Sequence, residues 1–121
     1  MITENTYLAV FTGSATGPRR QAWNALPAAD RPAREQEGMA AWGAWTETHG
    51  GSIVHAGGPV GATKRVSPEG VADLSNALPV FVVVRAASHE TAARMFEGHP
   101  HFTIFPGAAI EVMPVIRVPQ R

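Results

Sequence analysis

The chain of 121 residues contains no cysteine. This absence excludes disulfides, thiolate metal ligands and cysteine nucleophiles. Neither sign of charge is in excess, because ten basic residues balance ten acidic ones. A balanced charge argues against a general nucleic-acid binder, which usually carries a basic surface or stripe.

Long apolar runs are also missing, and so are the signals of membrane proteins. The longest apolar run, residues 78–84, is too short to cross a bilayer. Residues 1–4 contain an acidic residue and no basic one, whereas a secretory signal begins with a basic segment followed by an apolar one. We therefore expect a soluble cytoplasmic protein that has no membrane partner. The alanine-rich composition, with arginine far more common than lysine, indicates a bacterial genome of high GC content.

Nucleotide and hydrolase motifs are absent as well. Residues 57–61 are glycine-rich but lack the G-x-G-x-x-G or G-K-[ST] context of a nucleotide loop. No G-x-S-x-G nucleophile elbow occurs in the chain. We expect no organic cofactor.

Apolar stretches rich in β-branched residues alternate with helical patterns along the chain. The patterns predict strands at residues 7–12, 52–56, 79–85 and 110–118, and helices at residues 33–49 and 90–98. A short helical segment lies between Gly17 and Pro27, and residues 60–76 predict a hairpin or an excursion loop. This order predicts an α+β, ferredoxin-like fold in a single domain, residues 1–121, with both main helices on one face of an antiparallel sheet.

The two most apolar strands predict a partner. In the ferredoxin-like plan the first and third strands lie in the middle of the sheet, here residues 7–12 and 79–85. Neither alternates between apolar and polar residues, so both of their faces should be buried. Because two helices cover only one face, we expect a second copy to cover the other, in a homodimer joined sheet to sheet. The alternative is that residues 60–76 fold over that face.

Short motifs over most of the chain carry a family resemblance. They are YLAVF at residues 7–11, GGSIVHAGGP at residues 50–59, VFVVV at residues 80–84, the helix from Ser88 that ends in Gly98-His99-Pro100, and IEVMP at residues 110–114. In these motifs the chain resembles the YCII-related family, which includes proteins with a DGPF motif and belongs to the dimeric α+β barrel group. The resemblance implies a ferredoxin-like fold and a dimer.

The chain departs from that family where its chemistry is concerned. Many members carry a histidine in the first long helix, paired with an aspartate as a proposed catalytic couple. The corresponding helix has no histidine before His49. The Asp-Pro often found after the second helix is His99-Pro100 here, and Gly58-Pro59-Val60 stands nearest to the DGPF motif. The resemblance therefore does not supply an active site.

His99 and His101 flank a proline where the second helix should end. Because imidazole titrates near neutrality, His99 is our candidate catalytic proton carrier and His101 a candidate polar group of the pocket. The structural alternative makes His99 a helix C-terminal residue favoured by the macrodipole and leaves His101 exposed. His99, His101 and either Glu111 or His55 could supply metal ligands, but the spacing does not require a metal and we expect none.

His55 and Glu111 are the other polar candidates for ligand binding. His55 should face the same side of its strand as Ile53, which would bury the ring as a ligand contact or as a core or interface histidine. Glu111 lies among apolar residues of the last strand. Glu111 is either a pocket carboxylate or one half of a structural ion pair with Arg85 or Arg117. We favour the ion pair.

The remaining candidates are tryptophans. Met39, Trp42 and Trp45 recur at steps of three in the first long helix, so Trp42 and Trp45 could wall a ligand pocket or simply belong to the core. Trp23 could cover the mouth of the pocket. We expect an enzyme that uses acid–base chemistry on a small organic molecule between sheet and helices. The alternative is a non-catalytic dimeric module that binds a small molecule or a protein.

Overall fold

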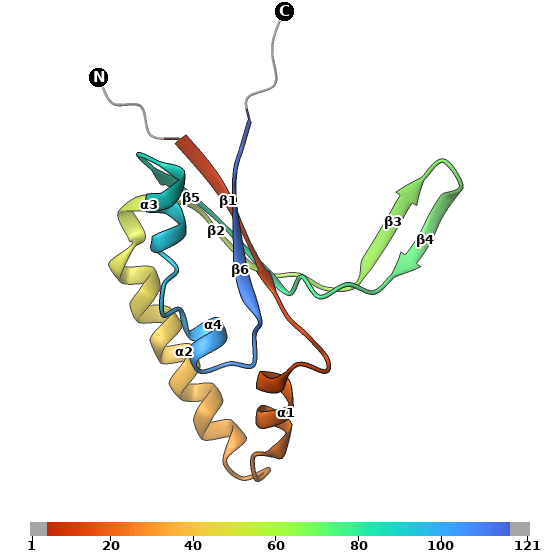
Figure 1. Ribbon diagram of the computed structural model, residues 1–121, viewed down its shortest axis with the longest axis vertical. Helices are drawn as coiled ribbons and strands as arrows, with labels where there is room; N and C mark the ends of the chain where they lie inside the picture. The colour runs from red at the N-terminus through yellow and green to blue at the C-terminus, as the bar shows by residue number, and fades with distance from the viewer. Residues whose placement is uncertain (1–4, 117–121) are drawn as a thin grey trace, which may run out of the picture.

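A computed structural model describes residues 5–116 as a twisted antiparallel sheet with helices packed on one face (Figure 1). The strands of the sheet are β1 (Asn5–Thr12), β2 (Ile53–Pro59), β5 (Val80–Ala86) and β6 (Ala109–Pro114). Their order is β2-β5-β1-β6, which is the ferredoxin-like order. The fold expected from the sequence is therefore confirmed, with β1 and β5 at the centre.

The helices follow the expected order with shifted ends. They are α1 (Pro18–Ala25), α2 (Arg31–Thr48), α3 (His89–Arg94) and α4 (Pro100–Thr103), with a 3-10 turn η1 (Gly50–Ser52) after α2. The helix expected over residues 90–98 is shorter, and the separate helix α4 was not expected. Pro100 begins α4 because proline suits the first turn, where its missing N–H costs no hydrogen bond.

The core lies between the central strands and the helices. Tyr7, Ala9 and Phe11 of β1 are buried, and so are Val82 and Val84 of β5. Their register pairs Ala9 with Val82 and Tyr7 with Val84, so one continuous apolar face meets the helices. Burying a large apolar side chain contributes roughly 1.5–3 kcal/mol, and this face supplies several of them.

The other face of the sheet is apolar too. Leu8 and Val10 of β1, and Phe81 and Val83 of β5, are only half-buried on it. The hairpin formed by β3 (Thr63–Ser67) and β4 (Gly70–Leu74) projects away from the sheet and pairs only with itself (Figure 1). The alternative that residues 60–76 cover this face is therefore wrong, and within residues 5–116 the face stays open.

Two strands differ from expectation. β2 continues through Gly57-Gly58-Pro59, where we expected a stop, because its pairing with β5 shifts register twice and Gly57 adopts φ +64. A side chain at Gly57 would meet the Phe81 carbonyl oxygen, so glycine allows this close approach. β6 is an edge strand, a position that tolerates Pro114, and it ends there, so residues 115–116 do not continue it as expected. Residues 117–118, expected at its end, lie outside the described residues.

Candidate active site

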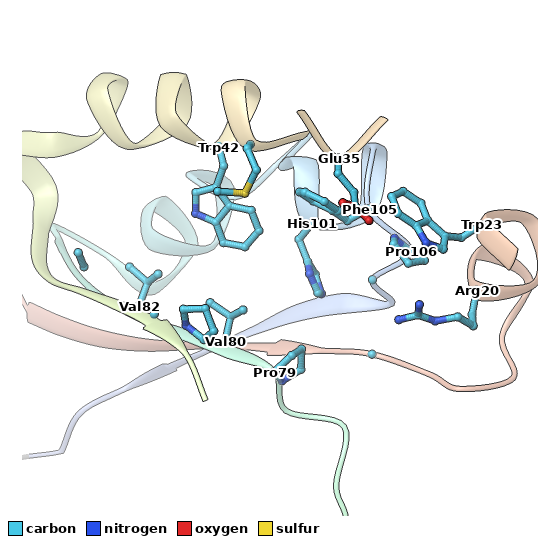
Figure 2. Close-up of a pocket in the computed structure, with 16 residues that line it drawn as sticks. Arg20, Trp23, Glu35, Trp42, Pro79, Val80, Val82, His101, Phe105 and Pro106 are labelled. Carbon is cyan, nitrogen blue, oxygen red and sulfur yellow. The ribbon is translucent and has the colours of Figure 1, made fainter. Parts of the chain in front are cut away.

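A cavity of about 580 Å³ opens between the helices and one end of the sheet (Figure 2). It lies on the helix-covered side, since Val80 and Val82 of β5 form its floor. The side chains that matter for its chemistry and shape are Arg20, Trp23, Glu35, Trp42, His101 and Phe105. Its size and its mainly apolar walls are typical of a site for a small organic ligand.

Helical spacing places the walls on two helices. Arg20 and Trp23 of α1 are three residues apart, so they share one face of that helix. Glu35, Met39 and Trp42 of α2 are separated by four and three residues and share another face. Both faces are directed at the cavity. Trp23 lines the cavity, and its covering of the mouth stays a prediction.

The loop after α4 closes the cavity through two tight glycine contacts. Phe105 packs onto Gly38 of α2, where a Cβ would lie 2.5 Å from the phenyl ring. Gly107 lies against His101, and a Cβ there would be 2.3 Å from the ring atoms Cε1 and Nε2. The N–H of Gly107 also donates to the His101 carbonyl at 2.9 Å. These contacts hold Phe105 and His101 in place as parts of the wall.

His101 has the geometry of a proton acceptor. Its ring nitrogen Nε2 lies 2.7 Å from the Thr12 carbonyl oxygen. Because a carbonyl oxygen only accepts, Nε2 must carry the proton, which leaves Nδ1 unprotonated. Nδ1 makes no hydrogen bond within residues 5–116, and Figure 2 shows the ring pointing into the cavity.

Burial sets the charge of His101. The residue is only 5% exposed, so the alternative that leaves it in solvent is wrong. Burial lowers the pKa of the imidazole below its usual range, although the nearby carbonyls of Thr12 and Ala109 favour the charged form. The ring is therefore neutral at pH 7, and Nδ1 is the nitrogen that can take up a proton.

His99 lies outside the cavity lining, in the aromatic core. It is fully buried, with the rings of Trp42 and Trp45 at centroid distances of 4.6 and 4.8 Å. Its Nδ1 accepts the backbone N–H of His101, which caps α4, while its Nε2 has no hydrogen-bond partner among residues 5–116. The proton-carrier role of His99 stays a prediction.

His55 and Glu111 lie away from the cavity lining. A register shift pairs Ile53 with the buried Val84 but His55 with Val83, so His55 faces the open side and not the side of Ile53. There its Nδ1 accepts the Gly57 N–H at 2.8 Å and its ring stacks on Phe81.

Glu111 is exposed on β6 opposite Val10. It forms no ion pair with Arg85 in the described residues, and Arg117 lies outside them. The structure thus brings Trp42 and His101 together at the cavity, but not His55 or Glu111.

Trp45 belongs to the core. Its indole N–H donates to the Met95 carbonyl at 2.8 Å, and its ring stacks on Phe96. Arg20, Glu35 and Phe105 line the cavity although the sequence did not single them out. The spacing of Arg20 with Trp23, and of Glu35 with Trp42, was the available signal.

The described residues contain neither a cluster of metal ligands nor a helix suited to a membrane. No group of three His, Cys, Asp or Glu side chains within residues 5–116 is arranged to hold a metal ion, so His99, His101 and Glu111 or His55 form no such set. None of the helices described has the length and hydropathy that a membrane span requires.

Comparison with known proteins supports the fold. No family model matches the chain, and no curated protein sequence does either. A solved structure of 5-chloro-2-hydroxyhydroquinone dehydrochlorinase (TftG) from Burkholderia phenoliruptrix AC1100, in complex with 2,5-dihydroxybenzoquinone, is similar with a TM-score of 0.50. The two sequences are 18% identical, and the match covers 88% of this chain and 89% of that chain. At this identity the similarity shows a shared fold alone.

Proposed function

We propose that the protein is an enzyme that moves a proton on a small organic molecule bound in the cavity of His101. The observation that carries this proposal is the buried His101 ring, whose Nε2 is occupied by the Thr12 carbonyl and whose Nδ1 has no partner in residues 5–116. A base held in one tautomer at the wall of an apolar cavity is the arrangement that general base catalysis uses.

The proton transfer follows from the hydrogen bond to Thr12. His101 Nδ1 accepts a proton from an O–H or C–H group of the substrate and becomes an imidazolium. The Thr12 carbonyl, 2.7 Å from Nε2, stabilises that cation by accepting the Nε2–H. The imidazolium then returns the proton to another atom of the substrate. This cycle needs no organic cofactor.

We further propose that the chain is a YCII-related member of the dimeric α+β barrel group and forms a homodimer. The strand order, the motifs named above and the fold shared with TftG support the group. The open apolar face of the sheet supports the sheet-to-sheet dimer. TftG is itself an enzyme, a dehydrochlorinase, which agrees with a catalytic function for this fold.

A non-catalytic binding module is the second candidate. The observation that favours it is the position of His99, which lies in the core and not on the cavity. The helix histidine of the YCII-related catalytic couple is also missing. Such a module would use the same cavity to hold a ligand without turning it over.

The test uses a matched pair of variants. The wild type, His101→Gln and His55→Gln are screened by thermal shift against small carboxylic acids, lactones and phenols. Ligands that bind are then incubated in D2O, and turnover or proton exchange is followed by NMR. The amide introduced by His101→Gln keeps an N–H donor for Thr12 but has no basic nitrogen, so we expect turnover or exchange to fall by roughly 10²–10⁴-fold. His55→Gln, outside the cavity, should behave as the wild type. Bound ligands that show no turnover or exchange would favour the binding module.

A further inference from the structure

Arg20 differs from its neighbouring arginines. Arg19, Arg31 and Arg34 each donate to a backbone carbonyl of the protein. Arg20 makes no hydrogen bond or ion pair with any residue in the range 5–116. It is half-buried beside the cavity, where a guanidinium that has lost part of its water is costly unless it finds a partner. The guanidinium is therefore available to a ligand.

Arg20 stands where two hollows meet. A second hollow of about 540 Å³, bordered by Ser14, Asn24 and Asn76, adjoins the apolar cavity. Arg20 lines both hollows. Figure 2 shows its side chain at the end of the cavity near Trp23 and Pro79, away from Trp42. A ligand inside the apolar cavity would thus meet a positive charge at its outer end.

Arg20 is a hydrogen-bond donor, whereas the other polar side chains of the cavity present hydrogen-bond acceptors. Nδ1 of His101 is an acceptor, and the Glu35 side chain at the rim carries acceptor oxygens. Glu35 would repel a ligand anion, so an anionic group is favoured at Arg20 and a donor group at the acceptors. Between these ends the walls are the rings of Trp23, Trp42 and Phe105, which suit a flat apolar body.

We propose that the cavity binds a small hydroxyaryl carboxylic acid, with its carboxylate paired to Arg20 and its hydroxyl donating to His101 or Glu35. The guanidinium fork matches a carboxylate through two parallel hydrogen bonds, which fixes the orientation of the ring. The hydroxyl is then placed where His101 can take its proton. This inference rests on the proposed function, because it assigns the substrate class of the same cavity.

The experiment measures binding by tryptophan fluorescence, since Trp23 and Trp42 line the cavity. The probes are 3- and 4-hydroxybenzoate and 4-hydroxyphenylacetate at millimolar concentrations, with methyl 4-hydroxybenzoate and phenol as uncharged counterparts. The proteins are the wild type, Arg20→Gln, Arg20→Lys and Arg65→Gln. Arg65 is exposed on the projecting hairpin, so its substitution removes the same charge far from the cavity.

We expect at least one hydroxy acid to bind the wild type and Arg65→Gln alike, and to bind Arg20→Gln about tenfold or more weakly. Arg20→Lys should recover part of the affinity, because it keeps the charge but not the fork. The methyl ester should bind all four proteins equally weakly. Equal affinity of the acids for the wild type and Arg20→Gln would overturn the inference.

The uncharged probes separate this inference from the proposed function. For this purpose His101→Gln is measured as a fifth protein. If the acids do not bind, and phenol or the ester binds His101→Gln more weakly than it binds the wild type and Arg20→Gln, the proposed substrate class is overturned and the role of His101 as the base is retained. If no acid binds and turnover of every ligand found is insensitive to His101→Gln, both proposals fail.

Discussion

The backbone N–H of His101 donates a hydrogen bond of 3.0 Å to Nδ1 of His99. This bond holds the Nδ1 lone pair and leaves the proton of His99 on Nε2, among aromatic rings. A second proton would break the bond and place a charge in the core. Burial, with smaller contributions from His101 and His49, accordingly lowers the pKa of His99 to about 4 from its ordinary 6.5.

This lowered pKa makes stability depend on pH. Above pH 6.5 His99 is neutral in both the folded and the unfolded chain, so its titration does not lower the free energy of unfolding there. Between pH 6.5 and about 4 only the unfolded chain takes up the proton, which favours unfolding. We expect His99 to remove about 1.4 kcal/mol of stability per pH unit, up to about 3 kcal/mol, as pH falls through this window. Urea unfolding across it measures the effect.

His99→Asn isolates this contribution. Asparagine keeps an acceptor for the His101 N–H at the cap of α4 but does not titrate. The variant should be less stable than the wild type at pH 7, because a large buried ring is lost, and its stability should fall less steeply with pH. His55→Asn, at an exposed histidine, serves as the control. Parallel pH profiles for His99→Asn and the wild type would contradict the assignment.

Two glycines of α2 should respond in opposite ways to alanine. A Cβ at Gly38 would lie 2.5 Å from the ring of Phe105, whereas a Cβ at Gly43 meets nothing within 4 Å. Gly38→Ala should destabilise the protein by roughly 1–3 kcal/mol through overpacking, and it should weaken ligand binding by displacing Phe105. Gly43→Ala should stabilise the exposed helix by about 0.5–1 kcal/mol. Thermal unfolding measures both, and equal shifts for the two variants would refute the tight contact.

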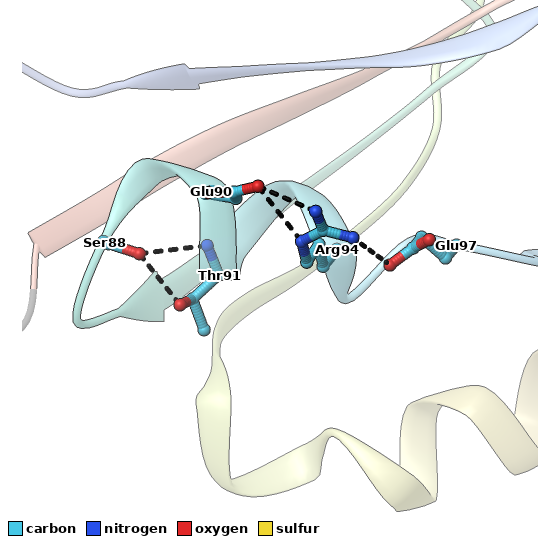
Figure 3. A network of polar contacts seen from close by, with 5 residues as sticks. All are labelled: Ser88, Glu90, Thr91, Arg94 and Glu97. Carbon is cyan, nitrogen blue, oxygen red and sulfur yellow. Dashed lines mark hydrogen bonds and ion pairs between the residues drawn. The ribbon is translucent and has the colours of Figure 1, made fainter.

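Ser88 should matter more to α3 than the ion pairs do. Its hydroxyl oxygen accepts the Thr91 N–H at 3.0 Å and so caps the N-terminus of this helix (Figure 3). Ser88→Ala should cost about 1 kcal/mol, and Ser88→Asn should restore most of it. Arg94→Gln removes the contacts to Glu90 and Glu97, but these side chains are 64–73% exposed, so stability should barely change. Denaturant midpoints rank the three variants, and a larger loss for Arg94→Gln would reverse this order of importance.

The fold could be predicted because its signals are long and periodic. The apolar runs of β1 and β5 identified the two central strands, and the helical pattern over residues 33–49 located α2. The path of β2 could not be predicted, because it depends on the backbone of Gly57 next to Phe81. The register shift between Ile53 and His55 then turned the histidine to the unexpected face of the sheet.

The candidate site was harder to predict than the fold. The sequence singled out His99 and His101 together. Only the packing of Pro100 and α4 places the His99 ring in the core and the His101 ring at the cavity. A helix of four residues leaves no periodic pattern to read. Arg20 and Glu35 share their helix faces with Trp23 and Trp42, but this spacing alone does not show that the two faces border one cavity. Their importance comes from the loop at Phe105, which lies far away in sequence.

The open face of the sheet yields a prediction about assembly. Leu8 pairs with Val83 and Val10 with Phe81, so four apolar side chains form a block at the centre of this face. If a second copy covers the block, light scattering after size exclusion should give the mass of a dimer. Val83→Glu should then give monomers, because a carboxylate buried between two sheets has no partner and loses its water.

A second valine provides the control for the dimer. Val66 on the projecting hairpin is 76% exposed, so Val66→Glu should leave both the mass and the melting curve unchanged. Val83 is half-exposed in the single chain, which lets the new carboxylate of Val83→Glu reach water once the copies separate. Circular dichroism should therefore show a folded Val83→Glu monomer. A monomeric wild type, or a Val83→Glu protein that keeps the dimer mass, would mean that the open face is not where the copies meet.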